Sequence, residues 1–176
     1  MKKDAANYGY SSSTIVDGTL VTIVGIGNEF RGDDAVGLRV VRKLAGSVPA
    51  GARTIELTGD QSHLLELMRS TDAMIIVDAV QSPAPAGTIF RIDAGKERVP
   101  ENFLFFSTHS LDSLNAIETA RTLGFLPDVI LLFGIVGKDF SYKIGLTKEV
   151  EDAIDVIKEK ILEELDPVRA HKGVWK

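Results

Sequence analysis

Three short stretches of this chain are almost entirely apolar, and they constrain its fold more than any other feature. They are residues 20–24, 73–77 and 129–135. Runs of this kind are typical of strands that a parallel sheet buries on both faces. Residues 53–57 and 88–92 are only half apolar, so we expect these strands nearer the edges of the same sheet. The sequence therefore predicts five strands.

Helical patterns lie between the strands, at residues 34–45, 62–69, 110–123 and 149–165. The helix at 110–123 is expected to turn Leu111, Leu114, Ile117 and Leu123 towards the core. Strands that alternate with helices indicate an α/β fold, here a single-domain, three-layer αβα arrangement with a twisted, mostly parallel sheet. The linker from 78 to 87 is too short for a parallel crossover, so the strand at 88–92 is expected to run antiparallel.

Composition narrows the possible functions. The net charge of −5 argues against a nucleic-acid partner, which would require a basic face. The absence of Cys excludes disulfides, thiolate ligands and a cysteine nucleophile. With no apolar run long enough for a bilayer and no signal peptide, we expect a cytoplasmic protein with no membrane partner. Residues 1–18 are expected to form a flexible extension, 19–165 the folded domain and 166–176 a tail.

The first strand leads into a glycine turn and two adjacent acids in the sequence GIGNEFRGDDAVG. Gly25 and Gly27 suit a tight bend, which could cradle a phosphate or aim a carboxylate at a metal. Phe30 stands where a dinucleotide-binding turn would carry its third glycine, which weakens the phosphate interpretation. Asp33 suits a helix cap, and Asp34 a favourable first-turn acid.

Further ionisable residues follow other strands of the predicted sheet. Asp60 follows the second strand, Asp78 comes directly after the third, and His109 lies at the start of the helix predicted at 110–123. Ligands in open α/β sheets collect at the carboxyl ends of strands. Each residue alone has an ordinary explanation as a cap, a turn acceptor or a solvated side chain. Their coincidence favours a site, and two carboxylates with one imidazole suit a late divalent metal such as Ni(II) or Zn(II).

With these residues the chain resembles the nickel–iron hydrogenase maturation endopeptidases. The resemblance rests on GIGNEFRGDDAVG, IIVDAV, FSTHSLD and FGIVG followed by IGLTKEV, in the order of the family and over most of residues 20–165. It implies that Asp34, Asp78 and His109 bind nickel. Many members carry an Asp-Gly or Cys-Gly-Thr type sequence after the second strand, whereas this chain has Thr58, Gly59 and Asp60. A catalytic role of Asp60 therefore stays open.

The resemblance also implies a function and partners. Members are proteases that remove the C-terminal extension of a hydrogenase large-subunit precursor after nickel insertion. The substrate supplies the nickel, so no tightly bound cofactor is expected, and a monomer suffices. The expected catalytic set is Asp34, Asp78, His109 and Asp60. Two alternatives remain at this point: a self-contained metal-dependent amidohydrolase or peptidase, and a non-catalytic nickel- or nucleotide-binding module.

Overall fold

A computed structural model describes residues 20–58, 61–97 and 108–165 of the chain. The strands are β1 (Val21–Ile26), β2 (Ala52–Leu57), β3 (Ala73–Val80), β4 (Ile89–Asp93) and β5 (Val129–Val136). The helices are the 3-10 turn η1 (Gly32–Ala35) and α1 (Val36–Leu44), α2 (Gln61–Arg69), α3 (Thr108–Thr122) and α4 (Lys148–Leu165). The predicted extension at 1–18 and tail at 166–176 lie outside the described residues.

The sheet has the strand order β2-β1-β3-β5-β4. Strands β2, β1, β3 and β5 are parallel, and β4 runs antiparallel to β5 at one edge. The prediction of a mostly parallel five-stranded sheet with one antiparallel strand is therefore confirmed. The two half-apolar strands, β2 and β4, occupy the edges as expected.

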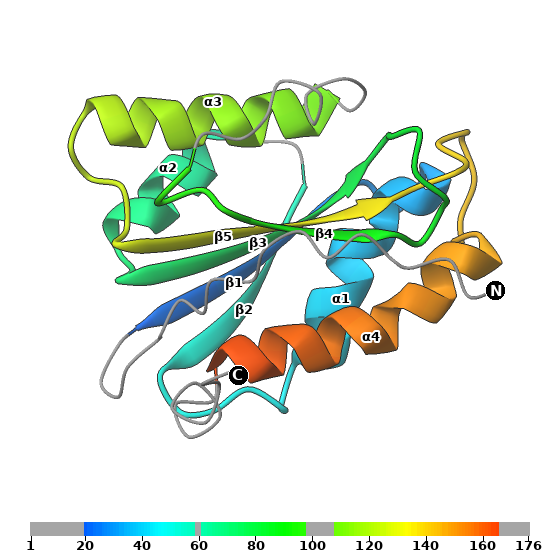
Figure 1. Cartoon of the computed structure of the whole chain (residues 1–176), viewed down its shortest axis with the longest axis horizontal. Helices are drawn as coiled ribbons and strands as arrows, with labels where there is room; N and C mark the ends of the chain where they lie inside the picture. Colours follow the sequence, from blue (N-terminus) through cyan, green and yellow to red (C-terminus); the bar gives the residue numbers. More distant parts are fainter. Residues whose placement is uncertain (1–19, 59–60, 98–107, 166–176) are drawn as a thin grey trace, which may run out of the picture.

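Helices cover both faces of the sheet, which gives the three layers seen in Figure 1. Alternate residues of the central strands face opposite layers. Ile23 and Ile75 pack with α1 and α4 in one core, whereas Val24 and Ile76 pack with α2 and α3 in the other. The strands β1, β3 and β5 point the same way, so their carboxyl ends meet at one end of the molecule. No helix among the described residues is both long and apolar enough to cross a bilayer.

Close backbone approach explains two glycines near that end. A Cβ on Gly37 would overlap the carbonyl oxygens of Ile26 and Val77, and one on Gly25 would overlap the carbonyl of Gly37. These two glycines therefore let the start of α1 lie directly on β1 and β3. Gly25 lies within β1, so it allows this contact rather than the bend expected from the sequence. The helix-packing glycine is thus Gly37, which lies beyond the turn.

Three local predictions are wrong. β3 does not end at Asp78 but continues to Val80, because β5 pairs with it along its full length. Leu123 does not face the core: it is 63% exposed, since α3 ends at Thr122 and Gly124 takes a positive φ of 75°. The first helix is also interrupted, because residues 32–35 form a 3-10 turn before α1 begins.

Candidate active site

Two predicted site residues, Asp34 and Asp78, are buried at the carboxyl end of the sheet. Asp34 is 2% exposed and Asp78 is 1% exposed. Asp34 belongs to η1, whose backbone lies against the end of β1: a Cβ on Gly27 would overlap the Asp34 carbonyl oxygen. Asp78 lies in β3, which pairs directly with β1. Both acids therefore stand at the same end of adjacent parallel strands.

The strand register assigns Asp78 to one face of the sheet. Asp78 pairs with Gly134 of β5 and shares its face with Met74 and Ile76, which pack in the core beneath α2 and α3. A carboxylate on a hydrogen-bonded strand is held more rigidly than one in a loop. This position fixes the backbone of Asp78 within the sheet and overturns its interpretation as a turn acceptor.

His109 belongs to the first turn of α3, the helix that covers the face to which Asp78 belongs. In Figure 1 the end of α3 that begins at Thr108 lies towards the carboxyl ends of the strands. The structure therefore brings the backbone of His109 to the same end as Asp34 and Asp78. The side chain of His109 lies outside the described part of the molecule, and so does Asp60.

Asp33, the neighbour of Asp34, does not cap a helix as the sequence predicts. No side chain caps η1 or α1. The Asp33 carboxylate is fully buried and accepts four hydrogen bonds from the segment 138–147. The donors to Oδ2 are the Lys138 and Asp139 amides, at 2.8 and 3.0 Å, and the Thr147 hydroxyl, at 2.9 Å; the Thr147 amide donates to Oδ1 at 2.6 Å. Asp33 thus anchors the loop after β5 to the turn after β1.

Backbone hydrogen bonds join these two loops further. The Gly32 amide donates to the Lys143 carbonyl, and the Lys143 amide donates to the Phe30 carbonyl, both at 2.9 Å. The turn itself is closed by Asn28, whose Oδ1 accepts from the Phe30 amide at 3.0 Å, as its residue type predicts. We refer to residues 28–33 and 138–147 together as the paired loops.

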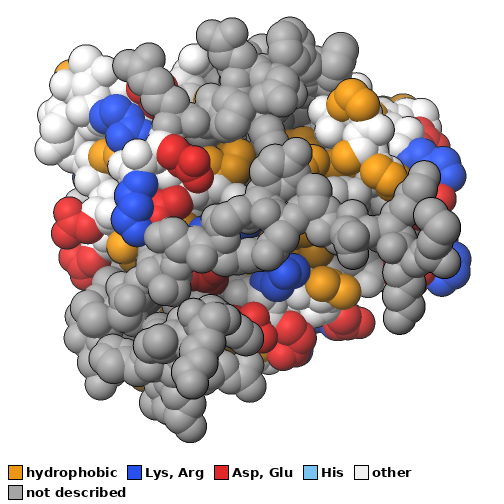
Figure 2. Space-filling view, in the orientation of Figure 1, with side chains coloured by type: hydrophobic (Ala, Val, Ile, Leu, Met, Phe, Trp, Pro, Cys, Tyr) orange, Lys and Arg blue, Asp and Glu red, His pale blue; other side chains and the backbone are white. Residues whose placement is uncertain are grey.

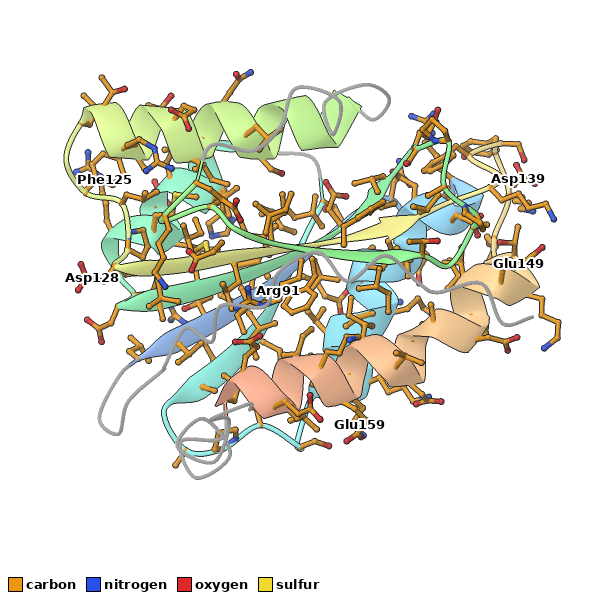
Figure 3. All side chains as sticks on the ribbon, viewed as in Figure 1. Arg91, Phe125, Asp128, Asp139, Glu149 and Glu159 are labelled. Atoms are coloured by element: carbon orange, nitrogen blue, oxygen red, sulfur yellow. The ribbon has the colours of Figure 1, made fainter. Side chains whose placement is uncertain are left out.

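Several charged side chains on the paired loops form ion pairs. A hydrogen bond from Lys143, with others from Ser141, holds the pKa of Asp139 well below its usual value of 3.8. A hydrogen bond from Lys138 likewise lowers the pKa of Glu149 and raises that of Lys138. Asp139 and Glu149 lie at the right-hand end of Figure 3, opposite Phe125 and Asp128. The local ion pairs therefore hold the loop at the carboxyl end of the sheet.

The described side chains do not by themselves complete a metal site. Within residues 20–58, 61–97 and 113–165, no three His, Asp or Glu side chains are grouped closely enough to hold an ion. His63 is exposed on α2, as its position in the sequence predicts. Acidic and basic side chains are interspersed on the face shown in Figure 2. Among the described side chains, the candidate site therefore consists of Asp34 and Asp78. The first turn of α3 lies at the same end of the sheet.

Comparison with known proteins identifies the family. A model of the family described as hydrogenase maturation protease matches residues 38–164. The chain belongs to the hydrogenase maturation proteases. These enzymes are peptide hydrolases, so the alternative of a non-catalytic binding module is wrong. The residues that this family model matches include Asp78 and His109, and they begin just after Asp34.

Individual members of the hydrogenase maturation proteases are similar to this chain over most of their length. The hydrogenase 2 maturation protease of Escherichia coli is 30% identical over 153 residues, which cover 81% of this chain and 88% of that protein. A putative hydrogenase maturation protease of Methanocaldococcus jannaschii is also 30% identical, over 82% of this chain and 96% of its own. The structure of the E. coli maturating endopeptidase HybD has a TM-score of 0.74, with 29% identity over 82% of this chain and 91% of that chain.

Sequence reasoning missed the anchoring role of Asp33. Its partners are 105 to 114 residues away along the chain, and three of the four donors are backbone amides, which leave no signal in the residue types. A signal was available in principle, because two adjacent acids at one helix start are more than a cap requires. The sequence alone assigned Asp33 to a cap and does not show that its carboxylate binds a loop so far along the chain.

Proposed function

We propose that this protein removes the C-terminal extension of a nickel–iron hydrogenase large-subunit precursor after nickel has been inserted. The supporting observation is the placement of Asp34 and Asp78, both buried at the carboxyl ends of adjacent strands, in a hydrogenase maturation protease. The E. coli relatives are named for hydrogenase maturation and for endopeptidase activity. The precursor is therefore the proposed partner, with one precursor per monomer in the cytoplasm.

We propose that Asp34, Asp78 and His109 contact nickel that the precursor already carries. A carboxylate, a carboxylate and an imidazole suit a borderline divalent ion and leave coordination positions for ligands of the substrate. In this proposal nickel belongs to the substrate, and the enzyme recognises precursor and metal together.

Hydrolysis then requires a nucleophile and a route for protons. The chain has no Cys, and its sequence has no serine-hydrolase elbow, so we assign the attack to a water molecule. The water oxygen bonds to the carbonyl carbon, its proton passes to a carboxylate, and the departing amine gains a proton. Asp34 and Asp60 are the proposed bases. The three nickel-contacting residues would contribute by fixing one peptide bond beside that water.

The nickel dependence of cleavage tests this proposal directly. Purified enzyme is mixed with nickel-loaded and with nickel-free precursor, and the mature product is quantified over time. The proposal predicts cleavage of the loaded precursor only. Equal cleavage of both forms would contradict nickel recognition. Turnover of short, metal-free peptides by the enzyme with its own bound metal would instead favour a self-contained peptidase.

A substitution in α3 tests the role of His109 independently. His109→Ala should abolish processing while the circular dichroism spectrum and the unfolding temperature stay near those of the wild type. His63→Ala is the matched control, because His63 is exposed on α2. Undiminished processing by His109→Ala would remove this residue from the site.

A further inference from the structure

Three large apolar side chains are exposed together on the paired loops. Phe30 is 50% exposed, Tyr142 86% and Ile144 75%. The other exposed large hydrophobic residues in the described part of the chain are Leu20 before β1, Leu123 after α3 and Val156 within α4. Single exposed apolar residues are common, whereas a local group of them marks a contact surface. The group on the paired loops therefore requires an explanation.

The geometry of this group is fixed rather than accidental. The rings of Phe30 and Tyr142 stack with their centroids 6.4 Å apart and their planes 20° from parallel. The backbone beneath them is joined by hydrogen bonds between Lys143 and both Phe30 and Gly32. The fully buried Asp33 anchors the rest of the loop. A surface held in this way loses little conformational entropy when a partner binds.

The surface also adjoins the candidate active site. The Asp34 amide donates to the carbonyl of Arg31, at 3.2 Å, so one short turn carries both Phe30 and the buried acid. Anything bound against Phe30 and Tyr142 therefore lies beside the end of the sheet where Asp34 and Asp78 are buried. In an endopeptidase, the polypeptide on either side of the cleaved bond is what occupies such a position.

The charges on this surface favour one kind of segment. Lys138 and Lys143 are already paired with Glu149 and Asp139. Arg31 is exposed, and it forms no ion pair with another residue in the described ranges. Arg31 can therefore pair with a carboxylate of the partner. Because the chain near the cleaved bond of an endopeptidase substrate is internal, that carboxylate would belong to an acidic side chain.

We propose that Phe30, Tyr142 and Ile144 dock an apolar segment of the hydrogenase precursor, with an acidic side chain of that segment at Arg31. This inference rests on the proposed function, because it takes the precursor as the substrate. The paired loops form a binding surface outside the nickel-contacting residues. Their task is to hold the precursor while the buried acids act.

A pair of double variants tests the docking surface. Phe30→Ser with Tyr142→Ser should raise the KM for nickel-loaded precursor at least ~10-fold and leave kcat within about 2-fold, since exposed aromatic anchors carry much of a binding energy. The matched control is Leu123→Ser with Val156→Ser, which removes two apolar side chains of similar exposure elsewhere. The control should keep the wild-type KM. Tyr142→Ser alone, at an 86% exposed residue, is the second variant in case the double variant unfolds.

Salt dependence tests the charged part of the surface. Arg31→Gln should weaken precursor binding several-fold at low salt, and its affinity should converge with that of the wild type at high salt, because added ions screen an exposed pair.

An unchanged KM in the aromatic variants, or an equal loss in the control, would overturn the docking surface. So would a change of oligomeric state without a change in KM. If wild-type enzyme binds the precursor through these residues but does not cleave it, the proposed function fails while the docking surface stands.

Discussion

The two ends of the sheet both contain buried acids, but the acids have different surroundings. Near the amino ends of the parallel strands, Asp93 is 6% exposed and forms an ion pair with Lys96 at 3.1 Å. At the carboxyl ends, Asp33, Asp34 and Asp78 are all at most 2% exposed and lie on adjacent elements. An ion pair with a surface lysine is an ordinary structural arrangement. Of the three acids at the carboxyl end, Asp33 accepts four hydrogen bonds from the paired loops, whereas Asp34 and Asp78 are the two to which we assign the chemistry.

The surfaces of the two ends differ in the same way. The amino end carries isolated apolar side chains such as Leu20 and Leu123, whereas the carboxyl end carries the group of Phe30, Tyr142 and Ile144. Backbone carbonyls at the amino end are satisfied locally: Arg121 donates to the carbonyl of Ala94 and, at 3.5 Å, to that of Gly95. The comparison teaches that the polar groups at the amino end are bonded locally, whereas the carboxyl end carries the candidate site and a group of exposed apolar side chains beside it.

The largest expected effect is a difference in processing rate between variants of Asp78 and Asp93, the acids at opposite ends of the sheet. Asp78→Asn should reduce processing of nickel-loaded precursor by at least ~100-fold, the scale of a lost catalytic group. The backbone pairing of β3 with β5 does not involve the side chain, so the fold should persist. Asp93→Asn is the control at the opposite end and should process at nearly the wild-type rate, with at most about 1 kcal/mol lost from its ion pair. The comparison fails if Asp93→Asn is as inactive as Asp78→Asn. Initial rates and thermal unfolding of both variants decide this.

The next effect concerns packing at the two ends of α1. Gly37→Ala should destabilise the protein by about 3 kcal/mol, because a Cβ there overlaps the carbonyls of Ile26 and Val77 and pushes α1 off the sheet. Gly46→Ala, just beyond the other end of α1, meets nothing within 4 Å and should cost only about 1 kcal/mol for its positive φ of 79°. Urea denaturation of both variants measures the difference. Equal losses would show that the close contact at the carboxyl end is not essential.

The smallest effect is a pH dependence in the paired loops. The pKa of Asp139 is lowered by Lys143, so this pair contributes stability above the ordinary carboxyl pKa of 3.8 and loses it as the pH falls through the lower folded value. Asp139→Asn should therefore unfold at a slightly lower temperature than the wild type at pH 7, and this difference should shrink towards pH 3. A difference that grows on acidification would contradict the assigned role of the pair.

Much of the fold could be predicted from the sequence because its signals are local. Continuous apolar runs identified the central strands, and the short linker before Thr88 identified the antiparallel strand. The end of β3 was misplaced because a charged residue, Asp78, looks like a strand terminus, whereas pairing with a partner of equal length carries the strand on to Val80. Periodicity also assigned Leu123 to the core, but Gly124 ends the helix before that residue.

The candidate site was predictable only in part. The topology of a parallel sheet brings Asp34 and Asp78 to one end, and this follows from their positions after strands. The resemblance assigned nickel to Asp34 and left Asp33 as a cap. The anchoring of the paired loops by Asp33 could not be predicted, because its partners lie more than 100 residues later in the chain. The exposed stacking of Phe30 on Tyr142 is likewise a long-range contact. The sequence therefore indicated a candidate site at this end of the sheet, and the structure shows that Asp33 anchors the loops beside it.

The central claim is that one of two adjacent buried acids acts while the other holds the loops. The most direct test measures kcat at saturating nickel-loaded precursor, together with the unfolding temperature, for Asp34→Asn and Asp33→Asn. Asp33→Asn should lose about 2–4 kcal/mol of stability, because an amide cannot accept all four hydrogen bonds, and its folded fraction should retain kcat. Asp34→Asn should stay folded and lose kcat by at least ~100-fold. A wild-type kcat for Asp34→Asn would contradict the account.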